Sequence, residues 1–96
     1  MVNKFDIGQF VNTLTEQAVV NALVERVKKK RKQMKLSQKK LSQKSGVAYA
    51  SIRRFETTGD ISLSSLLKIA HSLDSLKDFE ALFKGQAITN LKDYEV

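Results

Sequence analysis

The chain has 96 residues, of which 42% are hydrophobic, and a formal net charge of +7. This length leaves room for one small domain with a single hydrophobic core. The absence of cysteine excludes disulfide bonds and thiolate metal ligands. The sequence begins without a signal peptide and has no apolar run approaching the roughly 20 residues of a membrane span, so we expect a soluble protein of the cytoplasm.

The positive charge is concentrated in one part of the chain. Residues 26–54 contain twelve lysines and arginines and no acidic residue, whereas the other 67 residues contain five basic and ten acidic ones. A lysine run such as residues 28–32 is by itself most often a solvated helix face. Beside a rigid helical motif, however, such a segment can attract phosphate groups.

Proline is absent and glycine occurs at only four positions, so apolar spacing decides the secondary structure and predicts mainly helices. The first helix begins near Thr13 or Thr15, because Thr13 and Glu16 have the spacing of a capping box. It ends in the basic residues 28–32, which suit the negative end of the helix dipole. Its apolar residues recur at intervals of three and four, forming a buried face that continues toward Met34: Val20, Leu23, Val24 and Val27.

Two short helices follow, with a glycine corner between them. Ser37 is the expected cap of a helix over residues 38–45, which directs Leu41 and Ser42 inward. Gly46 comes just after that helix, where a left-handed backbone conformation costs a residue with a Cβ atom about 1 kcal/mol or more. We therefore predict that the chain turns at this glycine.

The second helix of this pair covers about residues 49–56. It begins after Ala48, which weakens the helix start by about 1 kcal/mol relative to a serine or threonine cap. Ile52 and Phe55 lie three residues apart and are expected inside, together with Val47. Helix, corner and helix form a rigid element that is small enough to enter the major groove of DNA.

Two further helices are predicted after a loop at Gly59 and Asp60. Ser62 caps the fourth helix, whose expected inward residues are Leu63, Leu66, Leu67, Ala70 and Leu73. Ser75 and Asp78 have the spacing of an N-terminal cap. They open a fifth helix, whose expected buried residues are Leu76, Phe79, Leu82 and Phe83.

The two ends of the chain carry more apolar side chains than a short solvated tail needs. We expect residues 1–14 and 85–96 to be arms that pack on another surface, on either side of a domain over residues 15–84. Residues 86–90 are short enough to form an extra strand.

The order of these features resembles the lambda-repressor-like, Cro-type helix-turn-helix family over about residues 22–83. The positions that carry the resemblance are Gln38, Leu41, Ser42, Gly46, Val47, Ile52, Phe55 and Glu56. Two positions depart from the family pattern. Ser42 replaces the usual alanine and adds a hydroxyl group that needs a partner, and Ser45 stands where an apolar residue is common.

Three stretches, residues 51–63, 65–70 and 78–83, also resemble HipB-like antitoxins, which are encoded beside HipA-like kinase toxins. The resemblances imply an all-α, compact five-helix domain, a repressor that binds a palindromic operator as a homodimer, and a HipA-like kinase toxin as a protein partner. A stand-alone phage-type or chromosomal repressor is the alternative. A basic amphipathic helix over residues 19–35 that binds anionic lipid or an acidic protein would leave the glycine corner unexplained.

The outward face of the second motif helix holds the candidate base contacts. Its outward residues are Tyr49, Ala50, Arg53 and Arg54, and the resemblance implies that these positions face bases or phosphates. Arg54 could pair with guanine O6 and N7, and Ala50 could contact a thymine methyl group. Arg53 could instead bind phosphate or pair with Glu56.

Candidate phosphate contacts lie mainly on the first motif helix. Gln38 stands at its N-terminus, where free N–H groups attract phosphate, although it could also be an ordinary exposed residue. The full set is Lys35, Ser37, Gln38, Lys39, Lys44 and Ser51. His71, the only histidine, lacks the neighbours of a catalytic or metal site. We expect no enzymatic activity, metal or cofactor, and a nucleoid-associated protein bound to double-stranded DNA.

Overall fold

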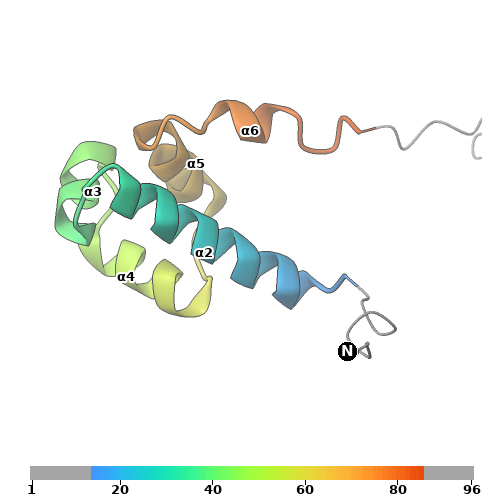
Figure 1. Ribbon diagram of the computed structural model, residues 1–96, viewed down its shortest axis with the longest axis horizontal. Coiled ribbons are helices and arrows are strands. Elements are labelled where there is room, and N and C mark those ends of the chain that lie inside the picture. Colours follow the sequence, from blue (N-terminus) through green and yellow to red (C-terminus); the bar gives the residue numbers. More distant parts are fainter. Residues whose placement is uncertain (1–13, 86–96) are drawn as a thin grey trace, which may run out of the picture.

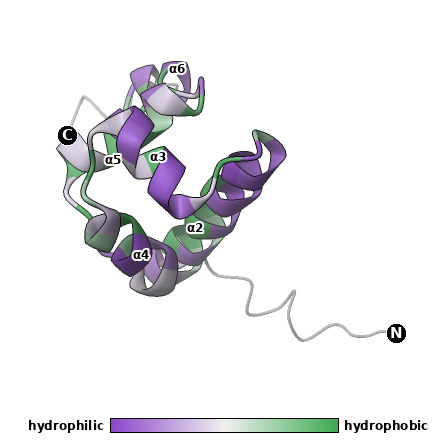
Figure 2. Ribbon diagram, turned by 90° about the vertical axis from the view of Figure 1, so that its left-hand side faces the viewer, coloured by the Kyte–Doolittle hydropathy of each residue, from purple (hydrophilic) through white to green (hydrophobic). Residues whose placement is uncertain are grey.

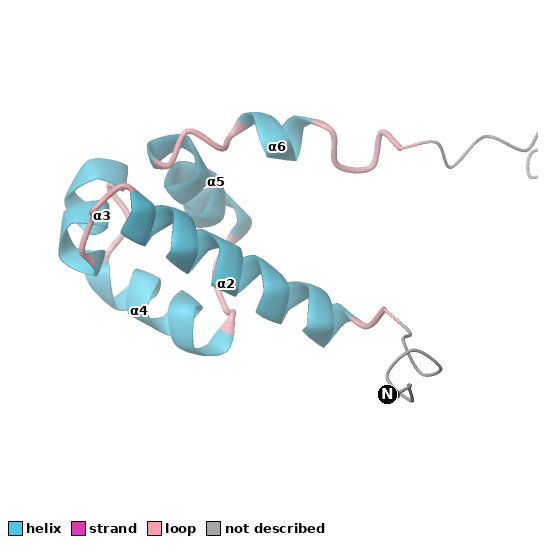
Figure 3. Cartoon of the chain, viewed as in Figure 1, coloured by secondary structure: helices cyan, strands magenta, loops and turns pink. Residues whose placement is uncertain are grey.

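The computed structural model describes residues 14–85, which form five helices and no strand (Figures 1 and 3). The helices are α2 (Glu16–Gln33), α3 (Gln38–Ser45), α4 (Tyr49–Thr58), α5 (Leu63–Ser72) and α6 (Lys77–Glu80). The all-α prediction is confirmed for this part of the chain. The predicted strand at residues 86–90, the Thr13 cap and most of both arms lie outside the described residues. Within residues 14–85 no helix is long and apolar enough to cross a bilayer.

The long helix α2 is bounded by local hydrogen bonds at both ends. The Thr15 hydroxyl accepts a hydrogen bond from the Ala18 N–H at 3.1 Å, so Thr15 is the N-cap. At the other end Lys35 adopts a left-handed φ of 59°, and the Leu36 N–H donates to the Arg31 carbonyl oxygen at 3.1 Å. These are the features of a Schellman turn, with lysine in the position that usually holds glycine.

The core consists of two adjoining clusters of buried side chains. The first contains Leu41, Val47, Ile52, Ile69 and Leu73, and the second contains Val24, Phe55 and Leu66. Two predictions for α5 are wrong: Ile69 is fully buried although it is not among the predicted inward residues, and Leu63 is 66% exposed. Leu63 is the first residue of α5, and the side chains that reach the core come from the later turns of that helix.

The fifth predicted helix is much shorter than expected. Ser75 does not cap it, because the Ser75 hydroxyl donates to the Leu73 carbonyl oxygen at 3.0 Å. α6 ends at Glu80, after a single turn. Of its four predicted buried residues only Phe79 packs against the core, whereas Leu76, Leu82 and Phe83 are exposed.

Candidate nucleic-acid interface

The corner between α3 and α4 is held by the glycine and by two serine hydroxyls. Gly46 has a φ of 80°, which confirms the predicted left-handed turn. The Ser42 hydroxyl donates to the Val47 carbonyl oxygen at 2.6 Å, and the Val47 N–H donates to the Ser45 hydroxyl at 3.1 Å. The two serines that depart from the family pattern therefore fix the residue that follows the turn.

Helix α4 begins where the sequence predicts and continues two residues farther. Ala48 stands at the N-cap and makes no side-chain capping hydrogen bond. At the C-terminal end the hydroxyls of Thr57 and Thr58 donate to backbone carbonyl oxygens one turn earlier, each at 2.8 Å. Gly59, with a φ of 86°, ends the helix, so its left-handed conformation sets the C-terminal boundary.

A buried ion pair connects three helices behind the outward face of α4. Arg31 of α2 donates from Nε to Oε2 of Glu56 at 2.7 Å and from Nη2 to Oε1 at 2.9 Å. Gln38 of α3 donates its amide to the same Oε1 at 2.8 Å, and Arg31 Nη1 donates to the Leu36 carbonyl oxygen at 2.8 Å. Both charged residues are only 8% exposed, so this network fixes α4 relative to α2 and α3.

Burial raises the pKa of Glu56, but hydrogen bonds from Arg31 and Gln38, together with the charges of Arg31 and Lys28, outweigh burial and hold this pKa below its ordinary value of 4.5. Glu56 is therefore an anion that compensates the buried guanidinium at neutral pH. The sequence-based interpretation misses this network because it treats Arg31 as part of a solvated lysine run. The signal was available, since Arg31 follows Val24 and Val27 at helical spacing and so lies on the buried face of α2.

Tyr49, a candidate base contact, has two cations close to its ring. Lys39 Nζ and Arg53 Cζ are each 5.6 Å from the centre of its ring, a distance at which cation–π attraction is effective. Arg53 thus lies over the Tyr49 ring. It does not pair with Glu56, whose carboxylate binds Arg31 instead. The structure brings residues of α3 and α4 together into one basic, aromatic surface.

Arg54 lies one turn farther along the exposed face of α4 than Tyr49. Its Nη2 atom donates to Asp60 Oδ2 at 3.3 Å, and the two side chains are 69% and 68% exposed. Ala50 is exposed on the same short helix. The four candidate base contacts are therefore accessible, while Ile52, Phe55 and Glu56 of α4 are buried.

The candidate phosphate contacts occupy different local settings. The Ser37 hydroxyl accepts a hydrogen bond from the Lys40 N–H at 3.0 Å, which makes it the N-cap of α3. The amide of Gln38 is engaged by Glu56, while Ser51 lines a shallow hollow beside Arg54. Lys35, Lys39 and Lys44 are exposed. Figure 2 shows that α3 is mainly hydrophilic, which suits a surface that meets a charged backbone.

Comparison with known proteins agrees with this geometry. Residues 27–79, which contain α3, α4 and α5, match the family model described as helix-turn-helix. No curated protein and no solved structure matches the chain.

Proposed function

The chain belongs to the Cro/C1-type helix-turn-helix family and is thus a DNA-binding transcriptional regulator, and we propose that it is a sequence-specific repressor whose helix α4 reads its operator. The observation that carries this proposal is the arrangement of α4. Its inner residues are fixed in the core and in the ion pair between Arg31 and Glu56, while its outer face is exposed to solvent. A fixed helix with an open polar face is what base recognition in the major groove requires.

The exposed side chains of α4 suit direct recognition of bases. Arg54 can form two hydrogen bonds with guanine O6 and N7, which is worth about 1–3 kcal/mol of discrimination against another base. Tyr49, Ala50 and Arg53 complete the face that would lie in the groove. Lys39 contacts the Tyr49 ring from α3, so both motif helices would approach the DNA together.

Phosphate contacts would set the register of the protein on the duplex without reading sequence. The N-terminus of α3, with Ser37 and Gln38, offers backbone N–H groups to a phosphate. Lys35, Lys44 and Ser51 extend this set. Each phosphate that these residues neutralise should add roughly 0.9 to the log–log slope of affinity against salt concentration.

The test begins with selection of duplexes from a randomised library by the wild-type protein. Arg54→Ala should then lose about 1–3 kcal/mol of binding free energy on the selected duplex and leave affinity for a scrambled duplex almost unchanged. Lys77→Ala is the matched control, because it removes one positive charge from α6, away from α4 (Figure 1). Failure of the library to converge on any sequence would contradict specific recognition.

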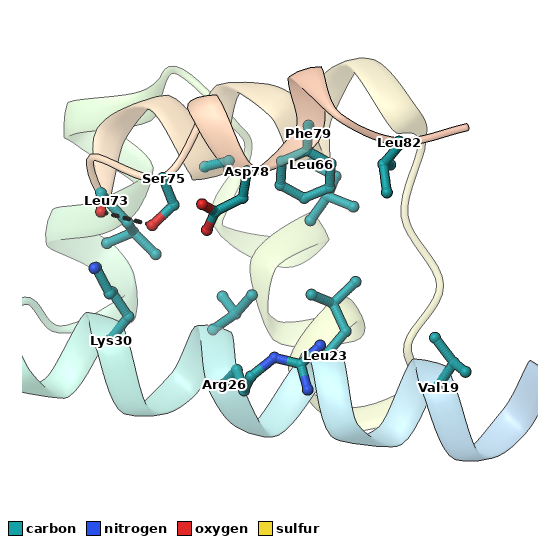
Figure 4. A pocket seen from close by; sticks show the side chains of 12 residues that line it. Val19, Leu23, Arg26, Lys30, Leu66, Leu73, Ser75, Asp78, Phe79 and Leu82 are labelled. Atoms are coloured by element: carbon teal, nitrogen blue, oxygen red, sulfur yellow. Dashed lines mark hydrogen bonds between the residues drawn. The ribbon is translucent and has the colours of Figure 1, made fainter. Parts of the chain in front are cut away.

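We also propose that the repressor is a homodimer, because one short helix reads too few base pairs to select one site in a genome. A second copy would place its α4 about one DNA turn away, with roughly 34 Å between half-site centres. The structure has a candidate surface for this second copy. An apolar groove of about 460 Å³ runs between α2 and α6 (Figure 4), bordered by Val19, Leu23, Leu66, Phe79 and Leu82.

The groove continues into an exposed apolar segment. Leu82 is 54% exposed and Phe83 is fully exposed, which favours a protein partner on this side. Phe83→Asp should convert a dimer into a monomer in light scattering, whereas Leu63→Asp, a change at another exposed apolar position at the start of α5, should leave the dimer intact. A monomeric wild-type protein would rule out the dimer, and a dimeric Phe83→Asp variant would rule out this surface.

A more specific role is suggested by the resemblance to HipB-like antitoxins. The α2–α6 groove is also the observation that favours a protein partner of this kind, since an antitoxin must bind its toxin as well as its operator. A HipA-like kinase encoded in the neighbouring reading frame, and its co-purification with this chain, would support the antitoxin role. Without such a neighbour, a stand-alone phage-type or chromosomal repressor is the better description.

The lipid-binding alternative has little support in the fold. The apolar face of α2 packs against the core through Val20, Val24 and Val27, so it is not free to enter a membrane surface. Flotation with anionic vesicles, measured beside DNA binding, would separate the two activities.

A further inference from the structure

Asp60 is an unusual neighbour for a DNA-reading face. Between residues 26 and 73 the sequence has only two carboxylates, Glu56 and Asp60. Glu56 is buried against Arg31, whereas Asp60 is exposed and receives a hydrogen bond from Arg54 at 3.3 Å. An exposed ion pair of this kind contributes little to folding, and a negative charge beside DNA weakens non-specific binding.

The turn that presents Asp60 is fixed relative to Arg54. The Thr58 hydroxyl donates to the Arg54 carbonyl oxygen at 2.8 Å and accepts a hydrogen bond from the Asp60 N–H at 3.1 Å. Between Thr58 and Asp60, Gly59 adopts its left-handed conformation, and the Gly59 N–H donates to the Phe55 carbonyl oxygen at 2.8 Å. These bonds fix the backbone of Asp60 relative to α4, and the Asp60 carboxylate lies next to the Arg54 side chain.

The contact with Asp60 leaves most of the guanidinium available. An arginine has five N–H donors in a planar fork, and only one nitrogen of Arg54, Nη2, contacts the carboxylate. The remaining donors still include a pair of parallel N–H groups that can meet guanine O6 and N7. The ion pair borders an open hollow of about 320 Å³ that Ser51 and Ser62 also line, so the guanidinium is accessible.

We propose that Asp60 is a specificity-determining residue that positions Arg54 for a base. The carboxylate holds one edge of the guanidinium, so that less side-chain freedom is lost when the other edge binds guanine. Its charge also opposes the pairing of Arg54 with phosphates at random sites. This inference rests on the proposed reading of bases by Arg54.

The test compares four proteins: wild type, Asp60→Asn, Arg54→Ala and the double variant. Each is titrated with the duplex selected by the wild-type protein and with a scrambled duplex of equal length and composition, and the specificity ratio is the quotient of the two affinities. Asp60→Asn should bind the scrambled duplex more tightly, and its specificity ratio should fall about three- to fivefold. Asp74→Asn, the same change at the opposite end of α5, is the control and should leave the ratio unchanged.

The double variant separates positioning from simple repulsion. In the Arg54→Ala background, Asp60→Asn should leave the specificity ratio unchanged, because no guanidinium remains to be positioned. Equal tightening of both duplexes by Asp60→Asn in the wild-type background would overturn the proposal, since Asp60 would then act only by repulsion. A normal ratio for Arg54→Ala itself would instead refute base reading by Arg54, and with it this inference.

Discussion

The buried ion pair makes a quantitative prediction for Glu56→Gln. This change keeps the size of the side chain but leaves the Arg31 charge, which is only 8% exposed, without a counter-charge. Breaking a buried pair by removing one partner costs about 3–5 kcal/mol. Because the whole domain is expected to have about 5–15 kcal/mol of unfolding free energy, the variant should lose about a fifth or more of its stability.

Chemical and thermal denaturation would measure this cost. For a domain of this size a loss of 3 kcal/mol lowers the melting temperature by roughly 12 °C or more. Asp60→Asn is the internal control, because it neutralises the carboxylate of an exposed arginine pair and should cost less than about 1 kcal/mol. Equal, small losses in the two variants would refute the claim that the pair between Arg31 and Glu56 anchors α4.

The same pair predicts how stability depends on pH. The folded-state pKa of Glu56 lies below its ordinary value of 4.5, so the folded state binds fewer protons than the unfolded state in this range. The contribution of Glu56 is therefore fully present above pH 4.5 and is lost as the pH falls through the lower, folded-state pKa. Glu56→Gln should lack this component of acid destabilisation; a wild-type pH profile in the variant would contradict the assignment.

The remaining predictions concern the backbone. Gly46 and Gly59 have similar positive φ values, but a Cβ atom at Gly46 would meet nothing within 4 Å, whereas at Gly59 it would overlap the Val20 side chain. Gly46→Ala should therefore cost about 1–2 kcal/mol, and Gly59→Ala about 1–3 kcal/mol more; equal losses in urea titrations would show that α2 does not pack on this turn. Lys35→Gly should raise the unfolding free energy by up to about 1 kcal/mol, because glycine relieves the left-handed strain at φ 59°, and a less stable variant would argue against that turn.

The part of the fold that sequence predicts best is the motif itself. The Ser37 cap, the Gly46 corner and the inward Ile52 and Phe55 all follow from local rules, in which a polar cap, a residue free to adopt positive φ and apolar spacing point to the same structure. The first and last residues of α3 follow from the same signals. In this part of the chain the tertiary packing agrees with the local preferences of the residues.

The features that sequence reasoning misses depend on contacts between distant segments. The charge pattern groups Arg31 with its charged neighbours, yet its partner Glu56 lies 25 residues farther along the chain. The sequence pattern overestimates the extent of α6 because apolar spacing alone cannot tell a helix from a turn. Phe83 adopts a left-handed φ of 66°, which is incompatible with continuation of the helix. Whether the candidate base and phosphate contacts touch DNA stays a prediction.

The claim that α4 reads bases in the major groove can be tested with altered DNA. Purine N7 faces only the major groove, so the selected duplex can be rebuilt with 7-deazapurines, which lack this acceptor while keeping Watson–Crick pairing. Wild-type protein should lose about 1–3 kcal/mol of binding free energy on the altered duplex, and Arg54→Ala should bind the natural and altered duplexes almost equally. Equal affinity of the wild-type protein for both duplexes would contradict the account.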